Sequence, residues 1–184
     1  NPHGDCPMST LSVDTIQGKT TAGTVALPSG YVVQTATNKN TDQTNVTSSN
    51  SFIAITASQC SITSRLANSS FLYTGVLSLE TDITASGLRN FVRMHYTVNG
   101  GSTIIHDSVN VFNVEMATNT NNVGQVVINY LFDGITQSAG TTFVFSFQYR
   151  QNTTHSYFFN QQSLSDQPSG TSNASHITVQ EIAP

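Results

Sequence analysis

The chain has 184 residues and a mass of 19.7 kDa, which fits one domain, or one domain with an arm. Charged residues make up only 9% of it, and six Lys and Arg against ten Asp and Glu leave a net charge of −4. Because nucleic-acid and anionic membrane surfaces both attract basic residues, so few of them argue against both partners. No apolar run approaches the roughly 18 residues of a membrane span, so membrane insertion is not expected.

The composition predicts an all-β protein. Thr, Val, Ile, Phe and Tyr are abundant, and these residue types fit a pleated, half-buried surface. Typical helix formers are scarce, with two Lys, three Glu and four Arg. Although the chain is polar, its ten Phe and six Tyr argue against disorder, because disordered chains lack aromatic residues.

The first segment, residues 1–18, is predicted to be an arm or linker, and residues 19–184 to form the folded domain. Pro2, Gly4, Pro7 and Gly18 resist regular strand pairing. Deleting the arm should therefore leave the domain folded.

Short segments with period-two alternation follow the arm at fairly even spacing, with polar loops expected at 37–50, 117–125 and 161–175. About ten strands at this spacing are typical of an antiparallel β-sandwich or barrel. The expected strands are 30–36, 51–56, 60–65, 70–80, 91–98, 102–116, 125–133, 141–149, 157–159 and 177–182.

The clearest alternation lies in residues 141–149. Phe143, Phe145, Phe147 and Tyr149 are spaced by two and share one face of the expected strand. We predict that this aromatic face is buried.

Four segments together resemble the tumour-necrosis-factor-like and complement-head-like jelly rolls found in viral and phage surface proteins. They are the long strand at 71–80, the strand and Asn-Gly turn at 91–100, the pair at 126–132 and 139–145, and the closing strand at 175–183. The resemblance covers residues 51–184. The chain departs from the family where a Gly-Asp step is Gly140-Thr141, and it lacks an acidic loop cluster of the kind that binds calcium in some members.

The resemblance implies a jelly-roll β-sandwich that forms a homotrimer on the surface of a virion. Such a protein would be a non-enzymatic fibre, knob or decoration protein without a cofactor, with its arm docked on other shell or fibre proteins and its loops facing solvent, a host glycan or a receptor. Two alternatives are a secreted ligand of the tumour-necrosis-factor-like kind and a glycan-binding or glycan-active module.

Three aromatic residues are candidates for the oligomer interface. Tyr130 and Phe132 share one strand face, and Tyr73 lies on another strand. Because oligomer contacts are rich in aromatic side chains, these residues could contact a neighbouring copy. The alternative is that they pack in the core.

Arg89 and Arg93 flank Phe91 with a spacing of two on one expected strand. Two guanidinium groups at this spacing could clamp a carboxylate, such as that of a sialic acid or of an acidic partner residue. The alternative is an ordinary solvent-facing surface or a cross-strand ion pair.

The two cysteines, Cys6 and Cys60, could form a disulfide that fixes the arm to the domain, or they could be separate thiols. Four Asn-x-Ser/Thr sequons occur by chance or as glycosylation sites. They are Asn45, Asn68, Asn152 and Asn173.

Catalytic interpretations are weak. His106 and Asp107 are adjacent, so on a strand they would point to opposite faces. The alternative to a catalytic role, for His95 as well, is a surface or half-buried histidine. Glu80 and Asp82 share a strand face, as glycoside cleavage would need, but a turn role is the alternative. Asp133 precedes Gly134 and is expected in a turn rather than as a calcium ligand.

Overall fold

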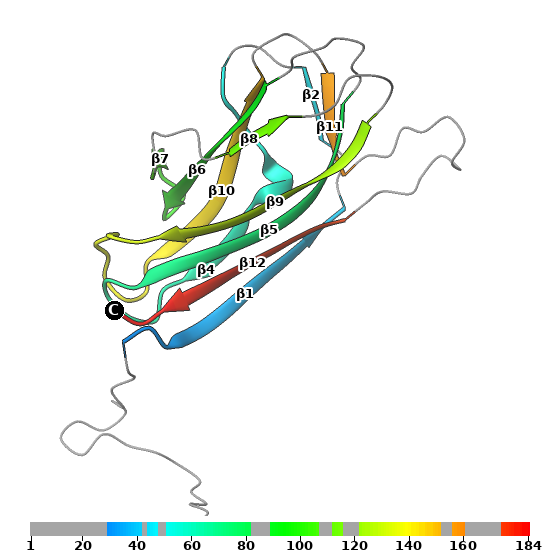
Figure 1. The fold of residues 1–184 in the computed structure, drawn as a ribbon. Coiled ribbons are helices and arrows are strands. Elements are labelled where there is room, and N and C mark those ends of the chain that lie inside the picture. Colours follow the sequence, from blue (N-terminus) through cyan, green and yellow to red (C-terminus); the bar gives the residue numbers. More distant parts are fainter. Residues whose placement is uncertain are drawn as a thin grey trace, which may run out of the picture.

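The computed structural model describes residues 29–41, 44–47, 51–81, 89–106, 112–115, 122–151, 156–160 and 174–184. The predicted arm at 1–18, including Cys6, lies outside the described residues. Two antiparallel sheets pack face to face as a sandwich (Figure 1).

Sheet A contains the strands β1 (Val32–Asn40), β2 (Thr44–Thr47), β5 (Ser70–Thr81), β9 (Asn122–Phe132), β11 (Ser156–Phe159) and β12 (Ser175–Ile182). Sheet B contains β3 (Ile53–Ala54), β4 (Cys60–Thr63), β6 (Arg89–Val98), β7 (Thr103–Ile105), β8 (Phe112–Glu115) and β10 (Thr142–Gln151). One short 3₁₀ turn, η1 (Thr56–Ser58), separates β3 from β4.

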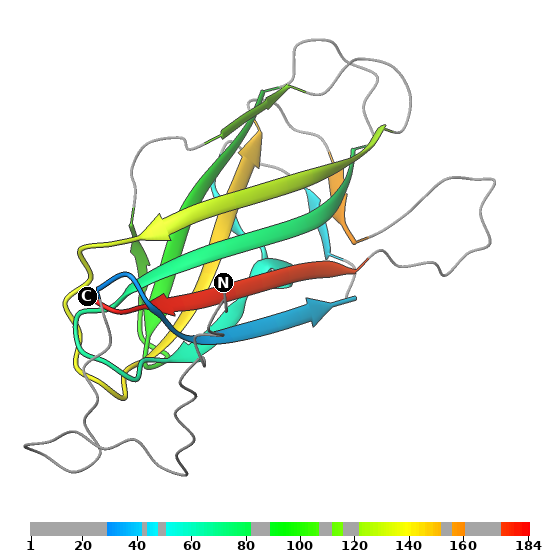
Figure 2. The ribbon, with the colours of Figure 1, turned by 60° about the horizontal axis from the view of Figure 1, so that its bottom comes forward.

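The strand order is that of a jelly roll. In sheet A the order is β1-β12-β5-β9, so the last strand lies between the first strand and β5. In sheet B the order is β4-β10-β6-β7, with β3 beside β10 and β8 beside β6. Between the main strands the chain passes repeatedly from one sheet to the other, as two nested Greek keys require. The strands of sheet A pass in front of β6 and β10 in Figure 2. The predicted all-β jelly-roll sandwich is confirmed.

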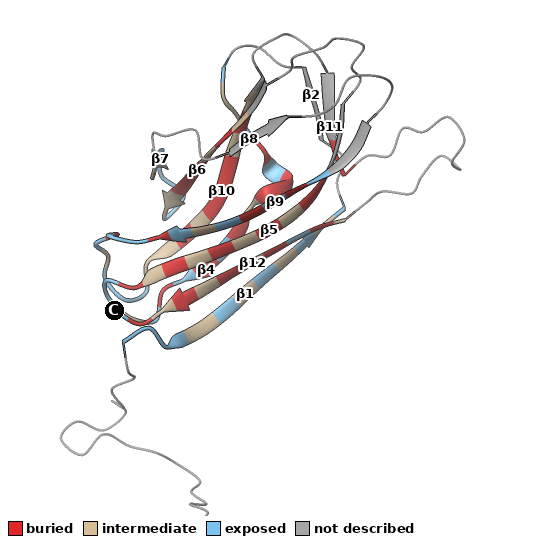
Figure 3. Cartoon of the chain, in the orientation of Figure 1, coloured by how far each residue is buried: buried red, intermediate tan, exposed pale blue. Residues whose placement is uncertain are grey.

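The core lies between the sheets, and the predicted aromatic face of β10 forms its centre. Phe143, Phe145, Phe147 and Tyr149 are all fully buried, as predicted. Figure 3 shows the alternation of buried and less buried residues along the long strands of the two sheets. Phe71 of β5 contacts both Phe143 and Phe145 with ring centroids 5.0 Å apart, which joins the two sheets.

Gly75 makes room for another core side chain. A Cβ atom at this position would lie 2.9 Å from Cε1 of Tyr73 and 3.1 Å from Cδ1 of Ile177. The Tyr73 ring can therefore lie over Gly75 on the same strand, and its hydroxyl donates a hydrogen bond of 2.7 Å to the carbonyl of Ser58.

One end of sheet A is fixed by a buried carboxylate. Glu181 faces inward from β12, is fully buried and accepts hydrogen bonds from the backbone N–H groups of Arg65 and Leu66. It also accepts hydrogen bonds from Ser69 Oγ at 2.8 Å and from Gln34 Nε2 at 2.6 Å. These contacts connect β12 to β1 and to the loop between β4 and β5.

The polar segment 37–50 was expected to be a loop, but β1 continues to Asn40 and β2 lies within it. Pairing explains the difference, because Thr37 to Asn40 bond to β12 whatever their own side chains prefer. β9 likewise begins at Asn122 because it pairs with the far end of β5.

β11 and β12 lie one after the other along the same edge of β5. The chain leaves this line at Asn160 and returns at Ser175, and Asn160 Nδ2 lies 3.1 Å from Ser175 Oγ. The predicted loop at 161–175 thus ends one residue too late, and residues 161–173 lie outside the described part.

Candidate functional site

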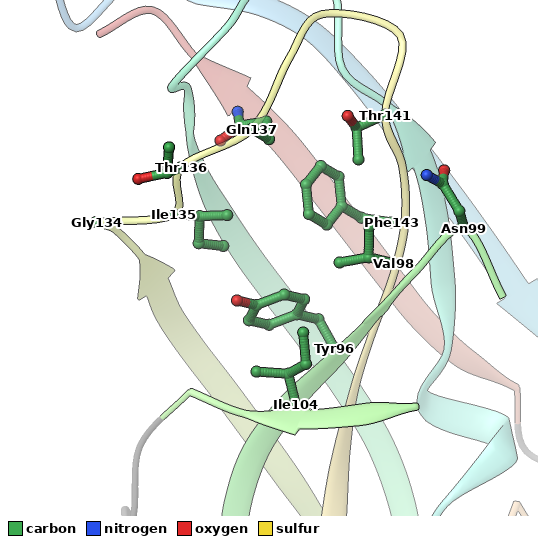
Figure 4. A pocket seen from close by; sticks show the side chains of 10 residues that line it. All are labelled: Tyr96, Val98, Asn99, Ile104, Gly134, Ile135, Thr136, Gln137, Thr141 and Phe143. Atoms are coloured by element: carbon green, nitrogen blue, oxygen red, sulfur yellow. The ribbon is translucent and has the colours of Figure 1, made fainter. Parts of the chain in front are cut away.

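A pocket opens at one end of the sandwich, between the β6–β7 turn and the loop that joins β9 to β10 (Figure 4). Its volume is about 290 Å³, at the lower limit for small-molecule sites. The lining residues are Tyr96, Val98, Asn99, Ile104, Gly134, Ile135, Thr136, Gln137, Thr141 and Phe143.

The turn beside this pocket is fixed by Asn99. Its backbone adopts the left-handed conformation with φ of 49°, as the Asn-Gly turn signal predicts. Asn99 Oδ1 accepts a hydrogen bond of 3.0 Å from the N–H of Thr142, and its own N–H donates to the Thr142 carbonyl at 2.8 Å. The turn is thereby tied to the start of β10.

The pocket has an apolar floor and a neutral polar rim. Tyr96, Ile135 and Phe143 are buried and form the floor, and none of the ten lining residues carries a charge. Gln137 contributes a buried Oε1 that has no hydrogen-bond partner in the described part of the chain. A small neutral group with a hydrogen-bond donor would suit this pocket.

His106 has a structural role beside the pocket. Its Nε2 donates to the carbonyl of Asp133 at 2.8 Å, since a carbonyl can only accept, and its Nδ1 lies 2.8 Å from the Tyr130 hydroxyl. Asp133 therefore contributes its backbone and has an exposed side chain. Asp107 lies outside the described residues, so the His–Asp pair has no description.

The structure places two of the three candidate interface residues in the core. Tyr73 and Phe132 are fully buried within a single chain, so they have no surface to offer to a second copy, and the core alternative holds for them. Tyr130 is half-buried and lies against Phe132, with centroids 4.8 Å apart. An interface role for Tyr130 stays a prediction.

The outer face of sheet A carries apolar residues that the sequence analysis missed. Val127 and Leu131 of β9 are 55% and 46% exposed. They pair with Val76 and Leu72 of β5, which are half-buried. The signal was present in the sequence, because residues 126–132 are apolar on both faces and not only on the face with Tyr130 and Phe132.

The outer face of sheet B carries Arg93. Arg93 lies near Phe52 and Arg150, whereas the side chain of Arg89 is not among those described. Arg150 escaped the sequence analysis because it belongs to β10, and only the register Gln148↔Arg93 brings it to β6.

Cys60 is buried on the inner face of β4 and forms no disulfide with a described residue, and burial raises the pKa of its thiol to about 11. Its disulfide with Cys6 stays a prediction, because Cys6 is not described.

Glu80 has a described backbone only, and Asp82 lies outside the described residues. Of the sequons, Asn68 is exposed in a turn with φ of 55°, and the other three have no described side chain. Within the described ranges, no three His, Cys, Asp or Glu side chains gather as a metal site. No helix in the part of the chain that the structure describes is long and apolar enough to cross a membrane.

Neither a family model nor a curated protein matches the chain. Among solved structures, a chain of infectious bursal disease virus, Gx strain, aligns with 96% of this chain at 14% identity and a TM-score of 0.39. A chain of the Gt strain aligns with 97% of this chain at 15% identity and a TM-score of 0.38. A chain from T=1 particles derived from infectious bursal virus aligns with 96% at 13% identity and a TM-score of 0.36. The chain spans 41–43% of the length of these chains. TM-scores this low carry no conclusion, so the fold assignment rests on the strand order.

Proposed function

We propose that the chain is a non-enzymatic structural protein of a virion surface, and that it assembles as a homotrimer through the outer face of sheet A. The jelly-roll strand order supports this proposal, because viral capsid domains use this fold. Lectins use it as well, so the fold alone does not decide the function. The Asn- and Thr-rich composition, with few charged residues, suits a surface that faces the outside of a particle.

The observation that carries the proposal is the chemistry of the outer face of sheet A. Two exposed aliphatic side chains, Val127 and Leu131, lie beside half-buried Leu72 and Val76. Thr74 and Asn129 separate the two apolar pairs, so the face bears no charge there. Covering such a face removes apolar area from water without desolvating an ion.

The occupant that fits this face best is a second copy of the same chain. A chain with a net charge of −4 repels its own copies over most of its surface, but this repulsion is smallest where the face is uncharged. Closed symmetric assembly is the usual outcome for such contacts, and the family resemblance implies three copies.

Light scattering on the purified chain tests the assembly, with an expected mass near three times 19.7 kDa. Leu131→Lys should give a folded monomer with the circular dichroism spectrum of the parent chain, because Leu131 is exposed. Ile104→Lys is the matched control, since Ile104 is 41% exposed but lies on β7 of sheet B. A monomeric parent chain, or a monomer from the Ile104 variant as well, would contradict the proposal.

The virion role needs its own experiment. Mass spectrometry of purified particles should detect the chain, and removal of residues 1–18 should leave the sandwich folded but abolish incorporation. If the truncated chain is incorporated normally, docking does not use the arm.

A further inference from the structure

Two guanidinium groups and two phenyl rings meet on the outer face of sheet B. The Arg93 guanidinium carbon lies 4.2 Å from the ring centroid of Phe52, just before β3. The Arg150 guanidinium carbon lies 4.9 Å from the same centroid and 4.4 Å from the centroid of Phe91. We call these four residues the arginine–phenylalanine cluster.

The cluster holds positive charge that no described side chain neutralises. Neither Arg93 nor Arg150 forms an ion pair within the described residues, and Arg150 Nε is buried there without a hydrogen-bond partner. Placing two like charges on one ring is unfavourable, and the ring faces compensate for only part of this repulsion. The chain has six Lys and Arg in all, so two of them beside each other make this the most cationic described surface.

The rings also fix the direction of the guanidinium groups. A guanidinium stacked on a ring exposes the N–H groups along its edge, and this planar edge matches the two oxygens of a carboxylate. Arg93 Nε is occupied by Gln148 Oε1, which orients the side chain and leaves its terminal nitrogens available. The four side chains of the cluster and Gln148 are partly exposed, so a ligand can reach them.

We propose that Arg93 and Arg150 bind the carboxylate of an acidic saccharide. The carboxylate supplies the missing counter-charge, and the rims of Phe52 and Phe91 offer apolar contact to the C–H groups of a sugar ring. A saccharide with one carboxylate fits better than an acidic protein segment, because a chain with a net charge of −4 repels a partner that carries several acids. This site does not depend on the trimer proposed above.

Titration of the full chain with N-acetylneuraminic acid, followed by amide chemical shifts in NMR, tests the proposal. The methyl ester of the same sugar has the same shape without the charge, so it should bind about tenfold or more weakly. This comparison needs no variant, so it remains informative if a substitution disturbs folding. Equal binding of acid and ester would overturn the proposal.

Arg93→Gln and Arg150→Gln should each weaken binding by about tenfold or more, the usual size of a lost charge-assisted hydrogen bond. Arg65→Gln is the matched control, because Arg65 is exposed in the loop after β4 and its removal changes the net charge equally. Arg65→Gln should change the dissociation constant less than about twofold. An equal loss in all three variants would indicate a general charge effect and would overturn the site.

Two further probes distinguish other sources of negative charge. Inorganic phosphate that binds as tightly as the sugar acid would show an unspecific anion site. A Glu-rich peptide that binds more tightly would indicate an acidic protein partner. Either result contradicts the saccharide proposal. Light scattering of Arg150→Gln should still give the parent mass, so failure of this site and failure of the proposed trimer are separable.

Discussion

The two outer faces of the sandwich differ in what must happen when a partner covers them. On sheet A the exposed side chains of Val127 and Leu131 can leave water without loss of ion hydration. On sheet B the guanidinium groups of Arg93 and Arg150 lie over phenyl rings, and a partner that covers them must supply negative charge.

This difference arises from strands that share one core. β9 and β10 both turn apolar residues inward, but β9 also presents aliphatic residues outward, whereas β10 presents Gln148 and Arg150. A jelly roll therefore leaves each outer face free to specialise while the inner faces hold the fold. The proposed assembly through sheet A would bury an uncharged face, whereas the proposed site on sheet B would bind an anion.

The largest expected effect comes from the core that both faces share. Phe145→Ala removes a fully buried ring that contacts Phe71, Tyr96 and Phe132, and should lower the free energy of unfolding by about 3–5 kcal/mol. Denaturant unfolding measures this loss. A loss below about 1 kcal/mol would mean that the ring does not sit in the core.

Loss of the Glu181 carboxylate should be the second largest effect and should act on sheet A. Glu181→Ala leaves the part-buried N–H groups of Arg65 and Leu66 without their acceptor, at about 1–3 kcal/mol for each. We expect the free energy of unfolding to fall by about 2–4 kcal/mol in denaturant titration. Glu181→Gln keeps one acceptor oxygen and should restore part of the loss. Two variants as stable as the parent chain would contradict this role.

The sequence was sufficient for the fold class and for the inner faces. Alternation in residues 141–149 is a local property of the chain, so it predicted the burial of Phe143, Phe145 and Phe147 without any knowledge of the partner strands. β2 and the end of β1 could not be predicted in the same way, because their polar residues form strands through pairing with distant β11 and β12.

The candidate sites were less predictable because they depend on register. The sequence pointed to Arg93 but not to Arg150, which is 57 positions away and comes close only through the pairing of β6 with β10. The pocket gathers residues from β6, β7, β10 and a loop, so no single segment carries its signal. Glu181, in contrast, has a signal in its own segment, because it is an acid at an inward position in the series Ser175, Ile177, Val179.

Low pH should decrease the stability of the folded chain through His95 on sheet B, and this effect should be smaller than the two above. His95 lies beside Arg93 in β6 and is 3% exposed, and burial, together with the charge of Arg93, lowers its pKa below the usual 6.5. The unfolded chain therefore binds a proton that the folded chain does not, so the His95 contribution to stability is complete above pH 6.5 and is lost as the pH falls below it.

Thermal melts at pH 7.5 and pH 5 measure this contribution. We expect His95→Gln to narrow the difference in melting temperature between the two pH values by about 2–4 °C. His176→Gln is the control, because His176 is exposed on β12 of sheet A. An unchanged difference in the His95 variant would show that other groups cause the acid sensitivity.

Added salt should weaken binding on sheet B but not assembly on sheet A, and this is the smallest of the expected effects. The binding of N-acetylneuraminic acid on sheet B depends on charge, so raising NaCl from about 0.05 M to about 0.5 M should weaken it several-fold, because the Debye length shortens from roughly 14 Å to roughly 4 Å. Contact through Val127 and Leu131 on sheet A involves no ion, so the mass from light scattering should stay constant or rise with salt. Dissociation of the assembly over the same salt range would mean that charged residues hold it together, and the distinction between the two faces would then fail.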